Sequence, residues 1–280
     1  MPSGKRARQQ RREAATAVRT PPPVRSKGVG GVRPRQASPR ALAIAGGAVV
    51  VVILAIVLGV VLGGGGKKTP AANLPAVGSA TWPGALIGST DVRDLYKGIP
   101  ESGLILGAPS APATLTEFVD LQCPLCQTFE VEQMPTIVRK YVRTGKLKIR
   151  LEPWSILSAP DSPRGQAATI AASLQNKGFQ FAQMLYLNQG PESSGWLTED
   201  MVGRAASSVD GLDPQRVLDD LDSSGVKATV SEVDNTASTQ GFRATPTILL
   251  NHKGQKAQVV SVGVPDAAQL QSQIDSAISG

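Results

Sequence analysis

The sequence is poor in the two residue types that most often bind zinc, with two cysteines and one histidine among 280 residues. A structural zinc site takes about four cysteine or histidine ligands. The three side chains present, Cys123, Cys126 and His252, are too few for such a site. We therefore expect no metal site and no bound cofactor.

The two cysteines are separated only by Pro124 and Leu125. A disulfide between Cys123 and Cys126 would close a very short loop, and such a loop adds little to the stability of a fold. We predict instead that the pair forms a reversible disulfide that makes and breaks disulfides in other proteins. An inert pair is the alternative.

Positive charge is concentrated at the start of the chain. Residues 1–40 carry 11 of the 29 lysines and arginines but only one acid, Glu13, which leaves 18 basic and 21 acidic residues in the remainder. The net charge of +7 therefore belongs to this segment, and we expect no nucleic-acid binding by the main body. Because it has few large apolar residues, we predict a disordered basic tail over residues 1–40. A nucleic-acid-binding arm is the alternative.

No charged residue occurs from Ala41 to Gly66, and residues 49–62 are continuously apolar. About 20 such residues span a bilayer as a helix, whereas the apolar core of a signal peptide has about 7–15. No A-x-A cleavage site closes the run, and no cysteine is available for lipidation. We predict an uncleaved signal-anchor, a single transmembrane helix over residues 41–63, with a cleaved leader as the alternative.

The charges on either side of this run predict its orientation. Ten net positive charges precede it, and only Lys67 and Lys68 follow closely. Because positive residues favour the cytoplasmic side, we expect residues 1–40 in the cytoplasm and the C-terminal part outside the cell membrane, where disulfides persist. The Gly-, Pro- and Ala-rich residues 64–90 are predicted to be a flexible linker, and residues 91–280 a globular domain.

Hydrophobic periodicity predicts a βαβ unit around the cysteines. Strands are expected at 104–106, 113–120 and 146–151. The helix between the last two is expected to end at Gly145. Its apolar residues recur at steps of three and four, at Phe129, Met134, Ile137, Val138, Tyr141 and Val142.

The second half of the chain predicts more helices and then two strands. We expect a helical insertion over about 160–240, made of one long helical stretch and shorter helices at 199–208, 214–222 and 227–240. Two strands at 247–250 and 258–262 follow, joined by a turn that contains an exposed His252. A stripe in the long stretch is formed by Ala167, Ile170, Ala171, Leu174, Phe181, Met184 and Leu185; the last helix carries Leu270, Ile274 and Ile278.

In this arrangement the chain resembles the DsbA-like branch of the thioredoxin superfamily, which are exported thiol-disulfide oxidoreductases. The resemblance covers residues 101–280 and rests on the segments Glu117–Cys126, Leu185–Gly190 and Gly241–Thr247. It implies a thioredoxin-like α/β fold with a helical insertion. The basic tail and the single anchor resemble actinobacterial members.

The position of the cysteines predicts their roles. Cys123 falls at a helix start, where free backbone N–H groups and the helix dipole favour a thiolate, so we expect it to be the nucleophile. Cys126 lies one turn further in and is expected to resolve the mixed disulfide. Pro124 can occupy the first helical turn without losing a needed hydrogen bond.

The resemblance assigns further site residues. It places Glu117, an acid on the apolar face of its strand, near the resolving thiol as a proton shuttle; an acid that reaches the sheet edge or forms a salt bridge is the alternative. Pro246 matches the cis-proline of the family, with a trans proline as the alternative. Thr245 would offer its backbone to an extended substrate, and Pro124 and Leu125 complete the expected substrate-binding residues. Asp120, on the opposite face, is expected to bind only backbone near the helix start.

One departure from the family pattern concerns Leu125. The strongest oxidants of the group have histidine there, and leucine offers neither hydrogen bond nor charge, so we expect a less depressed Cys123 pKa and a less oxidising couple.

The predicted function is a membrane-tethered, extracytoplasmic oxidoreductase that introduces or exchanges disulfides in exported, unfolded or thiol-containing proteins, reoxidised by a quinone-linked membrane partner. A reductase or isomerase kept reduced by a membrane partner, and a non-catalytic redox-sensing or binding module, are the alternatives.

Overall fold

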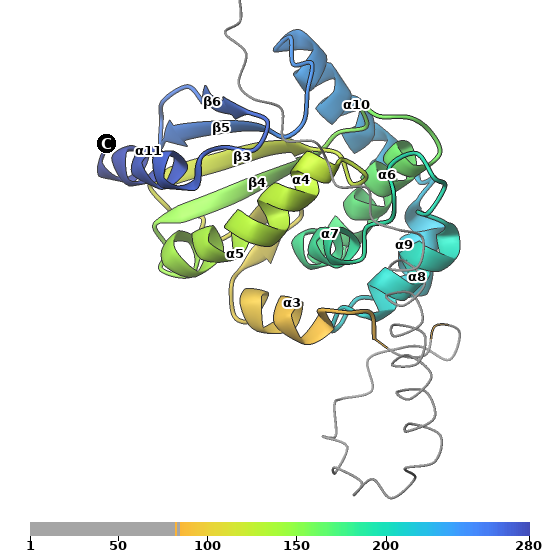
Figure 1. Ribbon diagram of the computed structural model, residues 1–280. Coiled ribbons are helices and arrows are strands. Elements are labelled where there is room, and N and C mark those ends of the chain that lie inside the picture. The colour runs from red at the N-terminus through yellow and green to blue at the C-terminus, as the bar shows by residue number, and fades with distance from the viewer. Residues whose placement is uncertain (1–81, 83–84) are drawn as a thin grey trace, which may run out of the picture. The chain divides into compact units, whose positions relative to one another are not determined.

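The computed structural model describes Trp82 and residues 85–280 of the chain (Figure 1). The predicted tail at 1–40 and the predicted anchor at 41–63 lie outside these residues. Within residue 82 and residues 85–280, no helix is both long enough and apolar enough to cross a membrane.

A six-stranded mixed sheet forms the centre of the fold, in the order β1-β2-β4-β3-β5-β6. The pair β3–β4 is parallel, and the other neighbouring pairs are antiparallel. The strands are β1 (Glu101–Ser102), β2 (Ile105–Leu106), β3 (Ala113–Val119), β4 (Leu147–Pro153), β5 (Thr247–His252) and β6 (Gln258–Val262). The predicted βαβ unit and the two later strands are confirmed, whereas β1 had no signal in the sequence.

The crossover between β3 and β4 is a continuous helical run with two wider π-type stretches. Pro135 lies just inside its second α-helical segment. A proline there cannot donate an amide hydrogen bond and would crowd the carbonyl one turn earlier in a regular α-helix, and the wider turn immediately before it gives the chain room. The segments are α4 (Pro124–Thr128), η1 (Phe129–Gln133), α5 (Met134–Ile137) and η2 (Val138–Val142).

The helical insertion is present, but its first stretch is two helices rather than the one that the sequence predicted. The chain turns between Ser173 and Gly178, with Asn176 at φ 57°. Leu174 is therefore 46% exposed instead of joining the buried stripe. The helices, which are drawn mainly toward the right of Figure 1, are α6 (Asp161–Ser173), α7 (Gly178–Leu187), α8 (Glu199–Ser207), α9 (Pro214–Asp220) and α10 (Ser224–Thr239).

Two hydrophobic clusters cover the two faces of the sheet. Leu115 and Val119 of β3 point into the larger cluster, beneath the crossover helix, and Glu117 shares their face as predicted. On the opposite face Phe118 packs edge-on against Phe242 at 5.0 Å between ring centroids. Helix α10 covers this second, smaller cluster.

The linker was predicted to extend to residue 90, but the folded domain begins before that residue. Helix α3 (Ser89–Tyr96) starts inside that range and buries Val92, Leu95 and Tyr96. The backbone N–H of Leu86 donates to the Ser208 hydroxyl at 2.9 Å. The short α3 was missed because its few apolar residues follow a Gly- and Pro-rich stretch.

His252 is not the exposed turn residue that the sequence predicted. It is the last residue of β5 and is partly buried. Its Nδ1 lies 2.9 Å from the carbonyl oxygen of Ala277 in α11 (Ala267–Ser279), which packs against β5. The strand runs two residues beyond the predicted end because this contact and the pairing of His252 with Ala113 extend it.

Two glycines in helices offer a matched test of the packing next to the cysteines. A Cβ on Gly165 of α6 would lie 2.6 Å from the Cβ of Leu121, whereas a Cβ on Gly225 of α10 would meet nothing within 4 Å. We expect Gly165→Ala to lower the free energy of unfolding by about 1–3 kcal/mol through overpacking. Gly225→Ala should leave it unchanged or raise it by up to about 1 kcal/mol. Urea denaturation followed by tryptophan fluorescence measures both, and equal effects would contradict the packing described.

Candidate active site

The cysteines stand where β3 passes into the crossover helix. Cys123 is the N-cap of α4 and Pro124 is in its first turn, as predicted. The backbone N–H of Cys123 donates to the Asp120 carbonyl at 3.0 Å, closing a tight turn after the strand. Both cysteines are thiols here, with Cys123 6% exposed and Cys126 fully buried.

The carboxylate of Asp120 holds this turn in place. One of its oxygens accepts from the backbone N–H of Gln122 at 3.0 Å. The other accepts from the N–H groups of Ile156 and Leu157, both at 3.0 Å, and from the Ser162 hydroxyl. Asp120 thus joins the end of β3, the segment after β4 and the start of α6. Asp120 binds backbone near the helix start as predicted, but not only there, because it also accepts from the segment after β4 and from the Ser162 hydroxyl.

The predicted cis-proline lies against the nucleophile. The Thr245–Pro246 peptide bond is cis, as the family resemblance implied. The Sγ of Cys123 lies 3.6 Å from the Thr245 carbonyl oxygen, to which the thiol donates. Gly263 donates its N–H to the Pro246 carbonyl at 2.8 Å and so ties this loop to the end of β6. The structure therefore brings Cys123, Thr245 and Pro246 together.

The two thiols differ strongly in acidity. A hydrogen bond from Cys126 is the largest cause that lowers the pKa of Cys123 to about 6, aided by the Thr245 side chain and by the N–H groups of Cys126 and Leu125. Burial raises the pKa of Cys126 well above its ordinary value. Near neutral pH the pair therefore consists of a Cys123 thiolate and a Cys126 thiol, which are the roles predicted for nucleophile and resolving residue.

Leu125 stabilises the Cys123 thiolate through its backbone N–H alone. Its side chain is 52% exposed beside the pair, and Pro124 is exposed as well. Both side chains can therefore touch a bound polypeptide, in keeping with the substrate contacts predicted for them.

Glu117 is buried as predicted, but the structure pairs it with an acid that the sequence analysis missed. Glu117 is 1% exposed and Glu130 5% exposed. Their carboxyl groups are hydrogen-bonded to each other, and burial raises the pKa of both. The signal in the sequence was that Glu130 follows Cys126 by one helical turn. The role of Glu117 as a proton shuttle for Cys126 stays a prediction.

Two side chains at the end of α7 donate hydrogen bonds to backbone carbonyls of the turn that leads into the cysteines. The Tyr186 hydroxyl donates to the Asp120 carbonyl at 3.2 Å. The Gln189 side chain donates to the carbonyls of Leu121 at 2.9 Å and Cys123 at 3.4 Å. The segment Leu185–Gly190 carried the family resemblance without an assigned role, and these bonds give it one.

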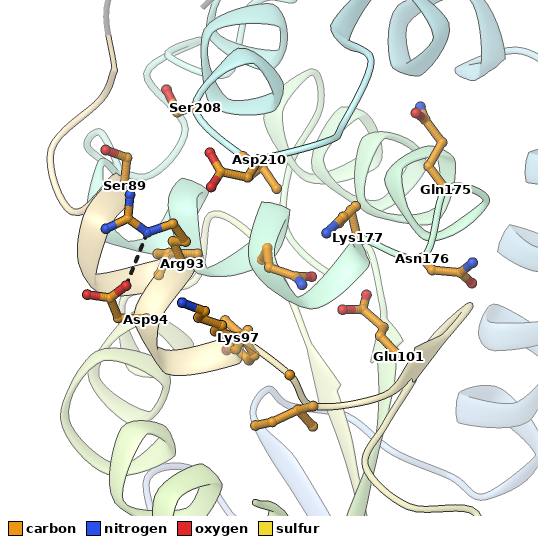
Figure 2. A pocket seen from close by; sticks show the side chains of 16 residues that line it. Ser89, Arg93, Asp94, Lys97, Glu101, Gln175, Asn176, Lys177, Ser208 and Asp210 are labelled. Atoms are coloured by element: carbon orange, nitrogen blue, oxygen red, sulfur yellow. Dashed lines mark hydrogen bonds and ion pairs between the residues drawn. The ribbon is translucent and has the colours of Figure 1, made fainter. Parts of the chain in front are cut away.

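A cavity of about 720 Å³ lies at a different place, between α3, β1 and the turns after α6 and α8 (Figure 2). Arg93 and Asp94 form an ion pair of 3.1 Å at its rim. The Glu101 carboxylate accepts from the Phe179 N–H at 3.1 Å, and burial raises its pKa to about 8. None of the predicted site residues lines this cavity. No group of three or more His, Cys, Asp or Glu side chains suited to a metal occurs in residues 82 and 85–280.

Residues 100–275 match the family model described as Thioredoxin. The chain belongs to the thioredoxin family. The cysteine pair at a helix start and the cis-proline beside it are the arrangement that the resemblance implied.

Two similar proteins are named disulfide bond formation protein D. The chain is 28% identical to a probable disulfide bond formation protein D of Bacillus cereus over 149 residues, which cover 52% of this chain and 68% of that protein. It is 25% identical to disulfide bond formation protein D of Bacillus subtilis over 155 residues, covering 53% and 68%. The prediction of a DsbA-like thiol-disulfide oxidoreductase is confirmed by these likenesses.

Solved structures agree on the thioredoxin-like fold with its helical insertion. Oxidised BdbD from Bacillus subtilis superposes with a TM-score of 0.57 at 22% identity, covering 64% of this chain and 94% of that one. A thioredoxin-like oxidoreductase from Silicibacter pomeroyi does so with a TM-score of 0.51 at 25% identity, covering 67% and 98%.

The acidity of Cys123 can be titrated through its reaction with iodoacetamide. We expect the alkylation rate to rise with a midpoint near pH 6, because the thiolate is the reacting species. In Cys126→Ala the midpoint should move up towards the ordinary cysteine value, since the largest stabilising hydrogen bond is lost. Leu125→Ala is the control and should keep the midpoint, because only the N–H of that residue contributes. An unchanged midpoint in Cys126→Ala would contradict the assigned cause.

Proposed function

We propose that this thiol-disulfide oxidoreductase works outside the cytoplasm as a disulfide donor, held at the membrane through residues 41–63. The observation that best supports electron flow from the client to the enzyme is the stabilised Cys123 thiolate. A thiolate exists only in the reduced enzyme, so its stabilisation favours the state in which the enzyme has taken up electrons. A pKa lowered to about 6 therefore supports an oxidant of other thiols.

The exchange follows from the two thiols. A thiolate of an exported, partly unfolded protein attacks Sγ of Cys123 in the Cys123–Cys126 disulfide. Cys126 leaves with the bonding electron pair and takes up a proton. A second thiolate of the same client attacks the client sulfur of the mixed disulfide, and Cys123 leaves as the stabilised thiolate. The client loses two electrons and the enzyme gains them.

The client is proposed to bind as an extended strand beside the cis-proline. The backbone of Thr245 lies against Cys123, and the exposed side chains of Pro124 and Leu125 border the same place. Backbone pairing in this mode tolerates many sequences, which suits an enzyme with varied clients. Return to the disulfide form needs a membrane acceptor of two electrons, for which a quinone-linked partner is proposed.

The redox potential of the Cys123–Cys126 pair distinguishes a disulfide donor from a reductase. Equilibration with a series of glutathione buffers should give a couple between about −180 and −120 mV, as for oxidising members of the superfamily. In a mixed-disulfide trap, Cys126→Ser should hold many different exported proteins, and Cys123→Ser, the control, should hold none.

A potential near −270 mV, the thioredoxin value, would overturn the donor proposal in favour of a reductase kept reduced at the membrane. Capture of one dedicated partner by Cys126→Ser would favour a redox sensor.

The membrane attachment and the orientation of the domain can each be tested, the second by labelling the two cysteines, because the chain has no others. For the attachment, we expect the full chain to stay with membranes after an alkaline wash. Deletion of residues 41–63 should release it. After reduction, a membrane-impermeant maleimide is added to intact cells whose cell wall and any outer membrane have been removed. It should label Cys123, since the domain is proposed to lie on the outer face of the cell membrane. The double variant Cys123→Ser, Cys126→Ser is the blank. Labelling only after the cells are lysed would contradict this orientation.

A further inference from the structure

The end of α7 and the cysteine turn are joined by hydrogen bonds in both directions. The Gln127 side chain of α4 donates to the Tyr186 carbonyl at 2.8 Å. In return, the Gln189 side chain donates to the carbonyls of Leu121 at 2.9 Å and Cys123 at 3.4 Å. One amide group therefore bridges two carbonyls of the turn, and the two segments fix each other's position.

The carbonyl of Cys123 is the point at which this bridge reaches the nucleophile. As the N-cap of α4, Cys123 has an extended backbone with φ −73° and ψ 121°. Its carbonyl accepts the first hydrogen bond of the helix, from the Gln127 N–H at 3.0 Å. The Gln189 amide is a second donor to the same oxygen. Together the two bonds fix how residue 123 is turned relative to the helix, and with it the direction of Sγ.

The acidity of Cys123 depends on this orientation. A hydrogen bond from Cys126 is the largest cause of its pKa of about 6; burial opposes it, and Thr245 and the N–H groups of Cys126 and Leu125 aid it. Hydrogen bonds weaken steeply when donor and acceptor move out of line, whereas the attraction of a charged side chain changes slowly with distance. A thiolate stabilised by hydrogen bonds is therefore sensitive to a small rotation of residue 123.

The bridging residue is itself held by the chain that enters the domain. Residues 86–88, which we name the entry segment, lead directly into α3. The Asn188 side chain donates to the Ile87 carbonyl at 3.0 Å and to the Met184 carbonyl at 2.9 Å. Asn188 thus connects the entry segment to the last turn of α7, and it directly precedes Gln189.

The contact between the entry segment and α7 leaves little room for movement. Gly88 has φ 86°, and a Cβ placed on it would lie 2.6 Å from Cδ1 of Leu187. At the other end of the segment, the Leu86 N–H donates to the Ser208 hydroxyl at 2.9 Å. Leu86 and Leu187 both pack against the larger hydrophobic cluster. The entry segment is thus bound at both ends, and the α7 residues that it contacts directly precede Gln189.

We propose that Gln189 is a positioning residue for Cys123. The entry segment holds Gln189 in place through its contacts with Leu187 and Asn188. The proposal rests on the thiol–disulfide exchange described above and deepens it, because it adds a residue that orients the nucleophile. The chain that leads from the proposed anchor at residues 41–63 to the domain passes through the entry segment. A displacement of that segment therefore changes the reactivity of Cys123.

The alkylation midpoint of Cys123 in the reduced full chain tests the bridge. Gln189→Met keeps a side chain of similar length but removes both donated bonds. We expect its midpoint to rise by about 0.5–1 pH unit, as for a thiolate that loses part of its hydrogen bonding. Its equilibrium with glutathione should move towards the disulfide form, because the reduced enzyme is less stabilised. A loss of stability alone would move neither quantity.

Asn188→Leu tests the entry segment separately, since the Asn188 side chain binds Ile87 and Met184 rather than the cysteine turn. Its midpoint should rise in the same direction as that of Gln189→Met, but by less. Gln175→Met is the matched control. Gln175 also donates to a backbone carbonyl of another segment, that of Asp213 at 3.2 Å, but it lines the cavity of Figure 2. Its substitution should leave the midpoint of Cys123 unchanged.

The outcomes separate the parts of the proposal. An unchanged midpoint in Gln189→Met would overturn it. A rise in Gln189→Met with none in Asn188→Leu would overturn the role of the entry segment. A wild-type midpoint near the ordinary cysteine value would instead count against the thiolate that supports the proposed function, so the two failures are distinguishable.

Nuclear magnetic resonance of the reduced wild-type chain tests the bridge without relying on any variant to fold. The side-chain amide protons of Gln189 should exchange slowly with solvent, because they are donated to carbonyls of the turn. The exposed Gln255 provides the reference for a side-chain amide in water. Exchange of the Gln189 amide as fast as that of Gln255 would show that the bridge is not formed and would overturn the proposal.

Discussion

The hydrogen bonds to Asp120 are the constraint on which the site depends. A single buried carboxylate accepts from three backbone N–H groups and one hydroxyl contributed by three separate segments. Without it, the N–H of Gln122 and the hydroxyl of Ser162 would be buried and unsatisfied, at a cost of about 1–3 kcal/mol each. The backbone carbonyl of Asp120 also accepts from the N–H of Cys123 and the hydroxyl of Tyr186, so the side chain and backbone of this one residue together position the nucleophile.

The difference between the two thiols follows from their positions at the start of one helix. Cys123 is the N-cap, so the N–H groups of Leu125 and Cys126 point towards its sulfur. Cys126 lies one turn inward, where burial dominates and opposes ionisation. If the helix began one residue earlier or later, Cys123 would no longer be its N-cap, and the sulfur would not lie at the positive end of the helix dipole. Thus the turn fixed by Asp120 sets the acidity of the pair as well as its location.

Much of this could be predicted from the sequence because it depends on local patterns. Period-two alternation identified β3 and β4, whereas the cis-proline was implied by the family resemblance of the Thr-Pro-Thr segment. The break at Asn176 and the pairing of Glu130 with Glu117 could not be predicted. Both depend on which segments meet in three dimensions: an acid in a helix resembles a solvent-facing one until the opposing strand is known. The short α3 was missed since its stability comes from packing rather than from its own periodicity.

The hydrogen bond between the two thiols links acidity to redox poise. The largest stabilisation of the Cys123 thiolate comes from Cys126, the group with which it forms the disulfide. This stabilisation is therefore present only in the reduced enzyme and disappears when the S–S bond forms. It also requires that Cys126 keep its proton, which burial ensures. Leu125 can then lack the side-chain hydrogen bond of a histidine and still leave Cys123 acidic, because the resolving thiol supplies the bond. Electron uptake by the pair and proton retention by Cys126 are consequently one coupled event.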